Sequence, residues 1–331
     1  LTMQGGNIVG CKVGGREGSG GGGVCIKGGT FRMMSGSIIG CLVDIYFAYG
    51  GGVWLEGSSS EFIMEGGSIE HCAVNSLTQG YGGGVCATGV AGDLSEGARF
   101  TMTGGSITEC SVSGHLSGNG GGVGITPELG GRPVFTMSGS AFIDSNTART
   151  VYYSNLLSGD NICISGGIMH ANGGTMAASP AGSNNCSLYN YSSGLITGGS
   201  SETTIFKGYV VNRSYATISG GKFMDTVLND GYSCIISGGE FYGAVTNKGT
   251  INNGVFYGLV TNTGTINGGS FATLPASDGS TWYPVTFEWN DGTAKAEDRH
   301  VMENTTVTPP APARTGYRLA YWYQTDENTA F

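Results

Sequence analysis

Charged residues are scarce in this chain: they make up 12% of its 331 residues, and the acidic ones outnumber the basic ones by 24 to 15. The resulting net charge of −9 argues against nucleic acid or an anionic membrane surface as a partner. No run of 18 or more apolar residues occurs, so the sequence holds no candidate for a membrane-spanning helix. Apolar residues nevertheless make up 39% of the chain, which is enough for a large core.

Glycine is abundant, with 63 residues, but it lacks the three-residue period of collagen. Instead it punctuates an internal repeat. Four stretches that end in cysteine are nearly alike: LTMQGGNIVGC at 1–11, FRMMSGSIIGC at 31–41, FIMEGGSIEHC at 62–72 and FTMTGGSITEC at 100–110. A second motif, Gly-Gly-Gly-Val, lies between them and is followed by Cys25, Trp54, Cys86 and Gly124. Later units are shorter, since Phe223, Phe241, Phe256 and Phe271 lie 18, 15 and 15 residues apart.

This repeat predicts strands rather than helices. A unit of 15 residues with a glycine pair has no room for two helices, because each glycine weakens a helix by about 1 kcal/mol. The apolar residues alternate with period two between the glycine corners, as in strands. Stacked units of this kind form a parallel β-helix, with equivalent residues about 4.8 Å apart. We expect one inward column made of Ile8, Ile38, Ile69, Ile107, Phe223, Phe241, Phe256 and Phe271.

The unequal unit lengths favour the right-handed form of this fold. Left-handed β-helices repeat a strict hexapeptide, whereas parallel crossovers prefer the right hand. We therefore predict an all-β fold, with a right-handed parallel β-helix over residues 1–271 and a linker or C-terminal cap at 272–284. The number of glycine corners predicts a stack roughly 50 Å long.

Asparagine and cysteine should each form a column of their own. Asn212, Asn229, Asn247 and Asn262 end four similar triplets, so their side-chain amides can hydrogen-bond along the stack. Asparagine is also a common turn residue, and this second interpretation stays open. Cysteine follows the inward isoleucine by three residues at Cys11, Cys41, Cys72 and Cys110.

Three interpretations of the cysteine column compete. Neighbouring thiols lie within disulfide range, but their side chains run parallel, which makes the required dihedral angle hard to reach. A metal site needs ligands that converge on one point, whereas a ladder spreads them along an axis. We favour a column of reduced, buried thiols that pack as small hydrophobes. The total of nine cysteines is odd, so at least one has no partner within the chain.

The Phe-x-Met-x-Gly-Gly-x-Ile-x-x-Cys and Gly-Gly-Gly-Val units resemble those of pectin-lyase-like right-handed β-helices, and most closely the adhesin-type repeat regions of secreted gut-bacterial proteins. This resemblance covers residues 1–271 and implies a fold rather than an activity. The same fold carries lyases, hydrolases, adhesins and inert stalks.

The last part of the chain resembles a different family. Val285-Thr286-Phe287, Pro310, Pro312, Arg314, Gly316-Tyr317 and Trp322-Tyr323 match the Listeria–Bacteroides repeat, the B repeat of internalin B, which is a small β-grasp-like surface module. Tyr321 departs from that pattern, which usually has glycine there, and we expect residues 285–331 to be a partial module. The resemblance implies a secreted or cell-surface protein with a tandem-repeat stalk. Because the sequence opens within a repeat, we expect the export signal and any anchor to lie outside it.

The sequence contains only weak patterns of the kind that mark a nucleotide-binding, catalytic or metal-binding site. The glycine-rich stretches lack the Lys-Ser/Thr of a phosphate-binding loop and precede strands rather than a helix. The acidic residues do not recur in register; the nearest approach to a cluster is Glu70 and His71 beside Glu109. The four histidines show no ligand spacing. We therefore assign no catalytic residue, no metal site and no cofactor, although a site could still assemble across coils.

Binding residues are better supported. The longer units carry insertions between the cysteine and the next Gly-Gly-Gly, and these should protrude side by side along one edge. Tyr46, Phe47, Tyr49 and Tyr81 would give that edge aromatic groups, and Tyr152 and Tyr153 begin another irregular stretch. Such side chains can stack on sugars or anchor a protein. They can equally cover the wall of the β-helix.

These observations predict an extracellular, adhesin-like protein of a gut bacterium, secreted or associated with the cell wall. We expect a monomer that binds a glycan or a host or bacterial surface protein through its loop edge. The alternative is a polysaccharide lyase or glycoside hydrolase built on the same scaffold.

Overall fold

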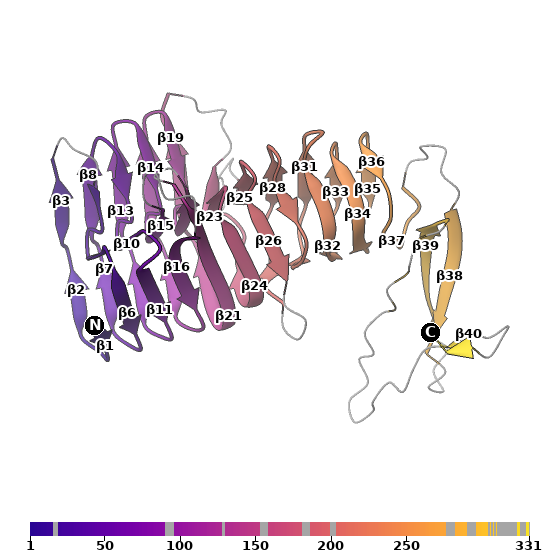
Figure 1. Ribbon diagram of the computed structural model, residues 1–331, viewed down its shortest axis with the longest axis horizontal. Helices are drawn as coiled ribbons and strands as arrows, with labels where there is room; N and C mark the ends of the chain where they lie inside the picture. The colour runs from indigo at the N-terminus through magenta and orange to yellow at the C-terminus, as the bar shows by residue number, and fades with distance from the viewer. Residues whose placement is uncertain are drawn as a thin grey trace.

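The computed structural model describes residues 1–15, 19–89, 96–127, 130–152, 158–180, 186–198, 203–275, 282–289, 296–303, 305, 307, 309, 323–324 and 329–330. Within these residues all regular structure is β-strand, in line with the predicted all-β class. Parallel strands follow one another along the long axis, from β1 near the N-terminus to β37 (Figure 1). Among the described residues no helix is long and apolar enough to cross a membrane.

The largest sheet contains two strand positions in each coil, joined at the glycine corner. The first position is occupied by β1 (Thr2–Met3), β6 (Gly29–Met33), β11 (Ser60–Met64), β16 (Glu96–Met102), β26 (Leu195–Gly198), β29 (Thr217–Ile218) and β36 (Thr265–Ile266). The second position is occupied by β2 (Asn7–Val9), β7 (Ser37–Ile39), β12 (Ser68–Glu70), β17 (Ser106–Thr108), β27 (Ile205–Phe206), β30 (Lys222–Phe223) and β37 (Ser270–Phe271). Four longer strands span both positions: β21 (Arg132–Asp144), β24 (Ile168–Met176), β32 (Ile235–Phe241) and β34 (Thr250–Phe256).

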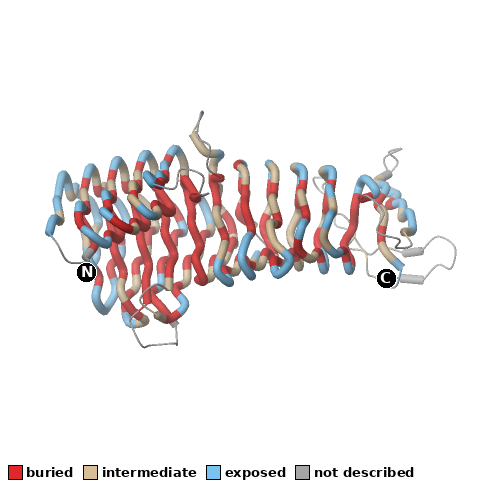
Figure 2. The backbone as a smooth tube through the Cα atoms, turned by 90° about the horizontal axis from the view of Figure 1, so that it is seen from above, coloured by how far each residue is buried: buried red, intermediate tan, exposed pale blue. Residues whose placement is uncertain are grey.

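A second sheet of ten parallel strands forms the opposite wall, and its strands mark ten coils. They are β5 (Val24–Ile26), β10 (Val53–Glu56), β15 (Val85–Thr88), β20 (Val123–Thr126), β23 (Gly159–Ser165), β25 (Cys186–Tyr191), β28 (Val210–Arg213), β31 (Val227–Asp230), β33 (Val245–Asn247) and β35 (Val260–Asn262). Figure 2 shows buried residues recurring at equivalent places along successive coils. The main core lies between these two sheets.

Two smaller parallel sheets are built from the insertions. One contains β3 (Lys12–Gly14), β8 (Leu42–Ile45), β13 (Ala73–Ser76), β18 (Ser111–Gly114) and β22 (Thr147–Thr150). The other contains β4 (Ser19–Gly20), β9 (Ala48–Tyr49), β14 (Gln79–Tyr81) and β19 (Ser117–Asn119). We call residues 1–152, which carry these sheets, the wide half, and residues 203–271, which lack them, the narrow half.

Two inward columns run through the whole stack. The predicted column is confirmed by the strand register, which threads it as Ile8, Ile38, Ile69, Ile107, Ile143, Met176, Phe206, Phe223, Phe241, Phe256 and Phe271. The other column runs Phe31, Phe62, Phe100, Phe135, Met169, Ile196, Ile218, Ile236, Ile251 and Ile266. Neighbouring phenylalanine rings lie 4.6–5.3 Å apart and within 12° of parallel. Stacked rings of this kind bury large apolar areas in a fixed register.

The glycine pairs turn the chain between the two strand positions of the largest sheet. Gly67 and Gly105 have φ angles of 82° and 81°, in the left-handed region that other residues rarely occupy. A Cβ atom on Gly67 would lie 2.4 Å from the carbonyl oxygen of Gly36 in the preceding coil. The corner therefore needs glycine both for its backbone angle and for the close approach of the coils.

The asparagine ladder is confirmed and begins one coil earlier than predicted. The side-chain amide of each residue donates to the next, over 2.7–2.8 Å, in the order Asn190, Asn212, Asn229, Asn247 and Asn262. In the wide half the same register position is apolar, and it changes from Ile164 to Asn190 between neighbouring coils. Asn190 Oδ1 is buried and accepts no hydrogen bond within the described residues, as expected where a ladder begins against an isoleucine.

The cysteine column also forms. Cys72 Sγ donates to the carbonyl oxygen of Ile38 in the preceding coil over 3.5 Å, and Cys110 Sγ makes the equivalent bond to Ile69 over 3.6 Å. In the next coil Asn146 takes over this role and donates from Nδ2 to the Ile107 carbonyl oxygen. All nine cysteines lie in the described residues, and no disulfide links any pair of them.

An antiparallel hairpin follows the last coil. Strands β38 (Trp282–Glu288) and β39 (Ala296–Met302) pair with each other, and β39 pairs antiparallel with β37. The Trp282 ring meets Phe271 edge-on at 5.2 Å, so the hairpin covers the end of the phenylalanine column. Two short strands, β40 (Tyr323–Gln324) and β41 (Thr329–Ala330), pair near the C-terminus. The right hand of the stack and the domain limits at 271 and 285 stay predictions.

Candidate functional site

The predicted binding residues fall into two pairs with different environments. Tyr46 and Phe47 are 47% and 37% exposed, at the tip of the turn between β8 and β9, with their rings in edge contact at 5.1 Å. Tyr49 and Tyr81 are only 5% and 6% exposed. The expected exposed edge therefore includes Tyr46 and Phe47 but excludes Tyr49 and Tyr81.

Tyr49 and Tyr81 pack in a small cluster of their own. Their rings stack at 6.1 Å, and Tyr49 stacks on Trp54 at 5.6 Å. The cluster also includes Cys86 and lies where β9 and β14 cover the outer face of the second sheet. Because the insertion strands fold back over this sheet, its outward side chains become a second buried layer. The two tyrosines thus cover the wall of the β-helix, which was the alternative interpretation.

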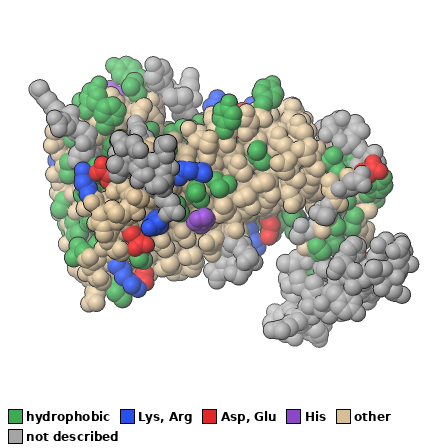
Figure 3. All heavy atoms as spheres, in the orientation of Figure 1, with side chains coloured by type: hydrophobic (Ala, Val, Ile, Leu, Met, Phe, Trp, Pro, Cys, Tyr) green, Lys and Arg blue, Asp and Glu red, His purple; other side chains and the backbone are tan. Residues whose placement is uncertain are grey.

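The exposed pair continues into a longer row along the stack. Leu77, Leu116, Val151 and Tyr152 are between 42% and 72% exposed. Backbone hydrogen bonds align the successive turns: Thr78 N donates to Tyr46 O, Leu116 N to Thr78 O, and Tyr152 N to His115 O. We call the six exposed side chains the crest: Tyr46, Phe47, Leu77, Leu116, Val151 and Tyr152. Figure 3 shows hydrophobic side chains gathered at the top of the wide half, where these turns lie.

The crest rests on a firm support. Beneath it, Val43, Val74, Val112 and Ala148 form a second buried core inside the insertion sheets. The hydroxyl groups of Ser76 and Thr78 both donate to the carbonyl oxygen of Tyr46, over 2.7 and 2.5 Å, and so hold one turn against the next. The His115 ring meets Tyr152 edge-on at 5.4 Å. The apolar tips are therefore presented from packed, hydrogen-bonded turns.

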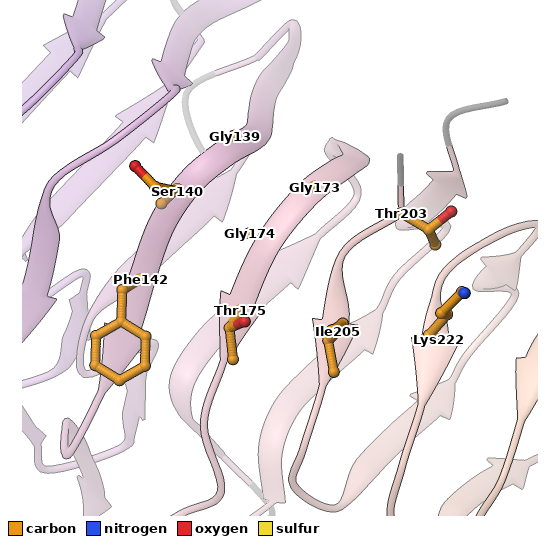
Figure 4. A pocket seen from close by; sticks show the side chains of 10 residues that line it. Gly139, Ser140, Phe142, Gly173, Gly174, Thr175, Thr203, Ile205 and Lys222 are labelled. Atoms are coloured by element: carbon orange, nitrogen blue, oxygen red, sulfur yellow. The ribbon is translucent and has the colours of Figure 1, made fainter. Parts of the chain in front are cut away.

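A shallow groove lies elsewhere, along the largest sheet in the second part of the stack. One hollow of about 520 Å³ is lined by Phe142, Thr175, Ile205 and Lys222 together with the glycines of β21 and β24 (Figure 4). An adjoining hollow of about 260 Å³ is lined by Glu240, which lies 3.6 Å from the Lys222 ammonium. Among the described residues that line this groove, Glu240 is the one carboxylate, and it is already paired with Lys222. The described lining therefore does not supply the cluster of three acids that would favour a hydrolase or lyase.

The one acid–histidine pair noted in the sequence lies on the surface. His71 Nε2 and Glu109 Oε2 are 2.5 Å apart, and both side chains are more than half exposed. Both residues have left-handed backbone angles, at the turn that precedes the cysteine in successive coils. Among the described residues no group of three or more His, Cys, Asp or Glu side chains could hold a metal ion.

Sequence reasoning missed Leu77, Leu116 and Val151. Leu77 and Leu116 are single leucines within polar insertions, NSLTQGY and SGHLSGN, where a periodic pattern cannot mark them. A signal was nevertheless present: Tyr46 and Leu77 each follow the column cysteine by five residues, and Leu116 follows it by six. Tyr153, named with Tyr152, lies outside the described residues.

Comparison with known protein families gives a match for the end of the chain, starting in strand β38 of the C-terminal hairpin. Residues 283–331 match the Listeria–Bacteroides repeat domain. This match confirms the resemblance predicted for the end of the chain. Domains of this family occur in surface or secreted bacterial proteins, and the match indicates a bacterial surface protein. No curated protein and no solved structure matches the chain.

Proposed function

We propose that this protein is an adhesin-like binding protein of the bacterial surface, secreted or wall-associated, and that the crest is its contact surface. The observation that supports the proposal is the row of six exposed apolar side chains on successive turns. Single exposed apolar residues are common, but contiguous ones mark interaction sites more often than chance. The Listeria–Bacteroides repeat is consistent with display outside the cell.

The shape of the crest favours a protein ligand over a glycan. Five of its six side chains are aliphatic or lie edge-on: Leu77, Leu116 and Val151 have no ring face, and the Tyr46 and Phe47 rings meet at 73°. A sugar needs a flat ring face with polar groups around it, whereas a convex apolar row fits into an apolar groove of a partner protein.

Binding to cells tests this proposal. The fluorescently labelled protein would be applied to panels of epithelial and bacterial cells, before and after treatment with protease or with periodate. We expect protease to abolish binding and periodate to leave it unchanged. Loss with periodate alone, together with hits on a glycan array, would mean that the ligand is a glycan. Absence of binding to every cell type and glycan would contradict the proposed function.

Cleavage is measured in the same screen. Polysaccharides that bind would be incubated with the protein and analysed for new reducing ends or unsaturated ends. We expect binding without cleavage. Turnover of any polysaccharide would support the lyase or hydrolase alternative.

A further inference from the structure

One glycine corner of the narrow half differs from its neighbours. The corners on either side read Ser237-Gly238-Gly239 and Asn267-Gly268-Gly269, whereas the corner between them reads Asn252-Asn253-Gly254. The second glycine is kept as Gly254, which has a left-handed φ of 138°. The first glycine is replaced by Asn253. An asparagine that precedes glycine is a reactive pair, because glycine has no side chain to shield its nitrogen.

The chain contains four such pairs, and all of them lie in the described residues: Asn119-Gly120, Asn172-Gly173, Asn253-Gly254 and Asn267-Gly268. In each pair the glycine nitrogen can attack the side-chain amide carbon of asparagine and close a five-membered ring. The attack needs the amide group to lie against the glycine nitrogen, in a part of the chain that can adjust. The four pairs differ in both respects, so the structure predicts different reactivities for them.

Asn253 meets both requirements. Its side chain is exposed, and Gly254 N donates to Asn253 Oδ1 over 2.8 Å, so the amide group lies against the nitrogen that would attack it. The register of β34 pairs residues on both sides of Gly254 with the preceding and following coils, but it gives Gly254 itself no partner. The corner is therefore the part of this strand that is least constrained by its neighbours.

Two of the other pairs are held in place. Asn119 is only 3% exposed, and the nitrogen of Gly120 donates to the carbonyl oxygen of Gly159 in the next coil over 3.0 Å. The pair Asn172-Gly173 is in register with the preceding coil, and its glycine nitrogen donates to Thr204 Oγ1 over 3.3 Å. In both pairs the glycine nitrogen is engaged by another coil and is not directed at its own asparagine.

The pair Asn267-Gly268 separates exposure from geometry. Asn267 is exposed, as Asn253 is. Its amide nitrogen, however, donates to Asn252 Oδ1 in the preceding coil over 2.8 Å. This bond directs the amide group along the stack and away from the glycine that follows it. Asn267 is therefore a control with the same sequence and similar exposure but a different orientation.

We propose that Asn253-Gly254 is a site of spontaneous deamidation, with water as the co-reactant and aspartate or isoaspartate as the product. The modified residue lines the hollow that also contains Glu240, which is paired with Lys222. Each event adds one negative charge to a chain whose net charge is −9. The hollow thus gains a second carboxylate without any enzyme or oxidant.

The reaction has two steps. Hydroxide removes the proton of Gly254 N, which forms a bond to Cγ of Asn253 while the bond from Cγ to Nδ2 breaks. The departing nitrogen takes up a proton from water and leaves as ammonia, and a cyclic imide remains. Water then opens the imide: cleavage at Cγ gives aspartate, and cleavage at the main-chain carbonyl gives isoaspartate. One water is consumed, one ammonia is released and nothing is oxidised or reduced.

Peptide mapping of the ageing protein tests the proposal. The folded protein would be incubated at neutral pH and body temperature, and a second sample in concentrated guanidinium chloride. Mass spectrometry with electron-transfer fragmentation then measures aspartate and isoaspartate at each pair. In guanidinium we expect similar rates at all four pairs. In the folded protein we expect Asn253 to react at least about tenfold faster than the other three asparagines.

Two variants sharpen the test. Asn253→Gly restores the glycine pair of the neighbouring corners, so the protein should fold and should no longer accumulate the acidic form that ion-exchange chromatography separates. Asn252→Ala removes the acceptor that holds the amide of Asn267. Deamidation at Asn267 should then become several-fold faster while that at Asn253 continues. Circular dichroism confirms that each incubated sample is still folded.

Three results would overturn the inference. The first is an intact Asn253 in the folded protein after Asn253 has reacted in guanidinium. The second is equal rates at all four pairs in the folded protein, which would mean that sequence alone sets the reactivity. The third is faster reaction at Asn267 than at Asn253 in the parent protein, since exposure would then outweigh the orientation of the amide.

Discussion

The wide and narrow halves share the two inward columns of the core but differ in the structure that surrounds these columns. In both, the two inward columns continue from coil to coil, and each coil from Phe31 onward contributes one phenylalanine and one isoleucine, except the coil that joins the two halves. In the wide half, insertion strands add a second core and the crest, whereas the narrow half passes from the largest sheet to the second sheet through short turns. The comparison shows that the inward columns determine how the coils stack. The insertions can therefore vary, and can form a surface with a different function, without changing the stack.

Phenylalanine changes column between the halves. It stands at the first strand position in the wide half, as in Phe100, and at the second in the narrow half, as in Phe241. The exchange passes through a coil that has methionine at both positions, Met169 and Met176. Methionine fills irregular space well, so this coil can join two different ring stacks without a void.

A buried charge should have the largest effect, and it should be equal in both halves. Ile107→Asp in the wide half and Ile236→Asp in the narrow half each place a carboxylate in the same core, at residues with no exposed surface. We expect each to destabilise the protein by about 4 kcal/mol or more. Urea unfolding followed by circular dichroism measures this. Sensitivity in one half alone would show that the two halves do not share a core.

Truncating the two kinds of tyrosine should separate packing from display. Tyr49→Ala removes a buried ring that stacks on Trp54 and Tyr81 and should cost about 3 kcal/mol. Tyr46→Ala removes an exposed ring and should change stability by less than about 0.5 kcal/mol. Equal losses of melting temperature would mean that the crest aromatics are packing groups.

The asparagine ladder distinguishes the narrow half from the wide one and can be broken in the middle. Asn229→Leu removes the acceptor of Asn212 and the donor to Asn247, so we expect a loss of about 2 kcal/mol. The reciprocal change, Leu55→Asn, buries an amide among apolar neighbours and should also destabilise. If Asn229→Leu were neutral in urea unfolding, the ladder would contribute no net stability.

Exchanging the columns within one coil should reveal their coupling. Ile218→Phe overfills one column and Phe223→Ile leaves space in the other, and each should cost about 1–3 kcal/mol. The double variant keeps the volume of the coil and should lose at least about 1 kcal/mol less than the sum of the single losses. If the stability losses of the two single variants simply added up in the double variant, the two side chains would not share one packing volume.

Much of the fold was predictable because the residues of each column recur at the same position of the sequence repeat. Period-two alternation and the glycine corners gave the parallel stack, and residues as far apart as Ile8 and Phe271 were assigned to one column correctly. Asn190 was missed because its triplet, Leu-Tyr-Asn, differs from the Val-x-Asn of the later coils. A column survives such changes because only the register position has to be kept.

The candidate site was only partly predictable. Tyr46 and Tyr49 lie three residues apart in one insertion, yet one is exposed and the other is buried. The difference arises because the chain turns between them and returns over the second sheet, a long-range contact that no local pattern encodes. The same limit explains why the crest leucines were missed.

The most direct test of the account compares binding by the crest with binding by exposed aromatics of the narrow half. One variant carries Tyr46→Ser, Phe47→Ser and Tyr152→Ser; its matched control carries Tyr215→Ser and Tyr232→Ser, at rings that are 70% and 92% exposed. Dissociation constants for cells that bind the parent protein would be measured by flow cytometry. We expect the crest variant to bind at least about tenfold more weakly, which corresponds to about 1.4 kcal/mol, and the control to bind like the parent. Unchanged binding by the crest variant, or an equal loss in the control, would contradict the account.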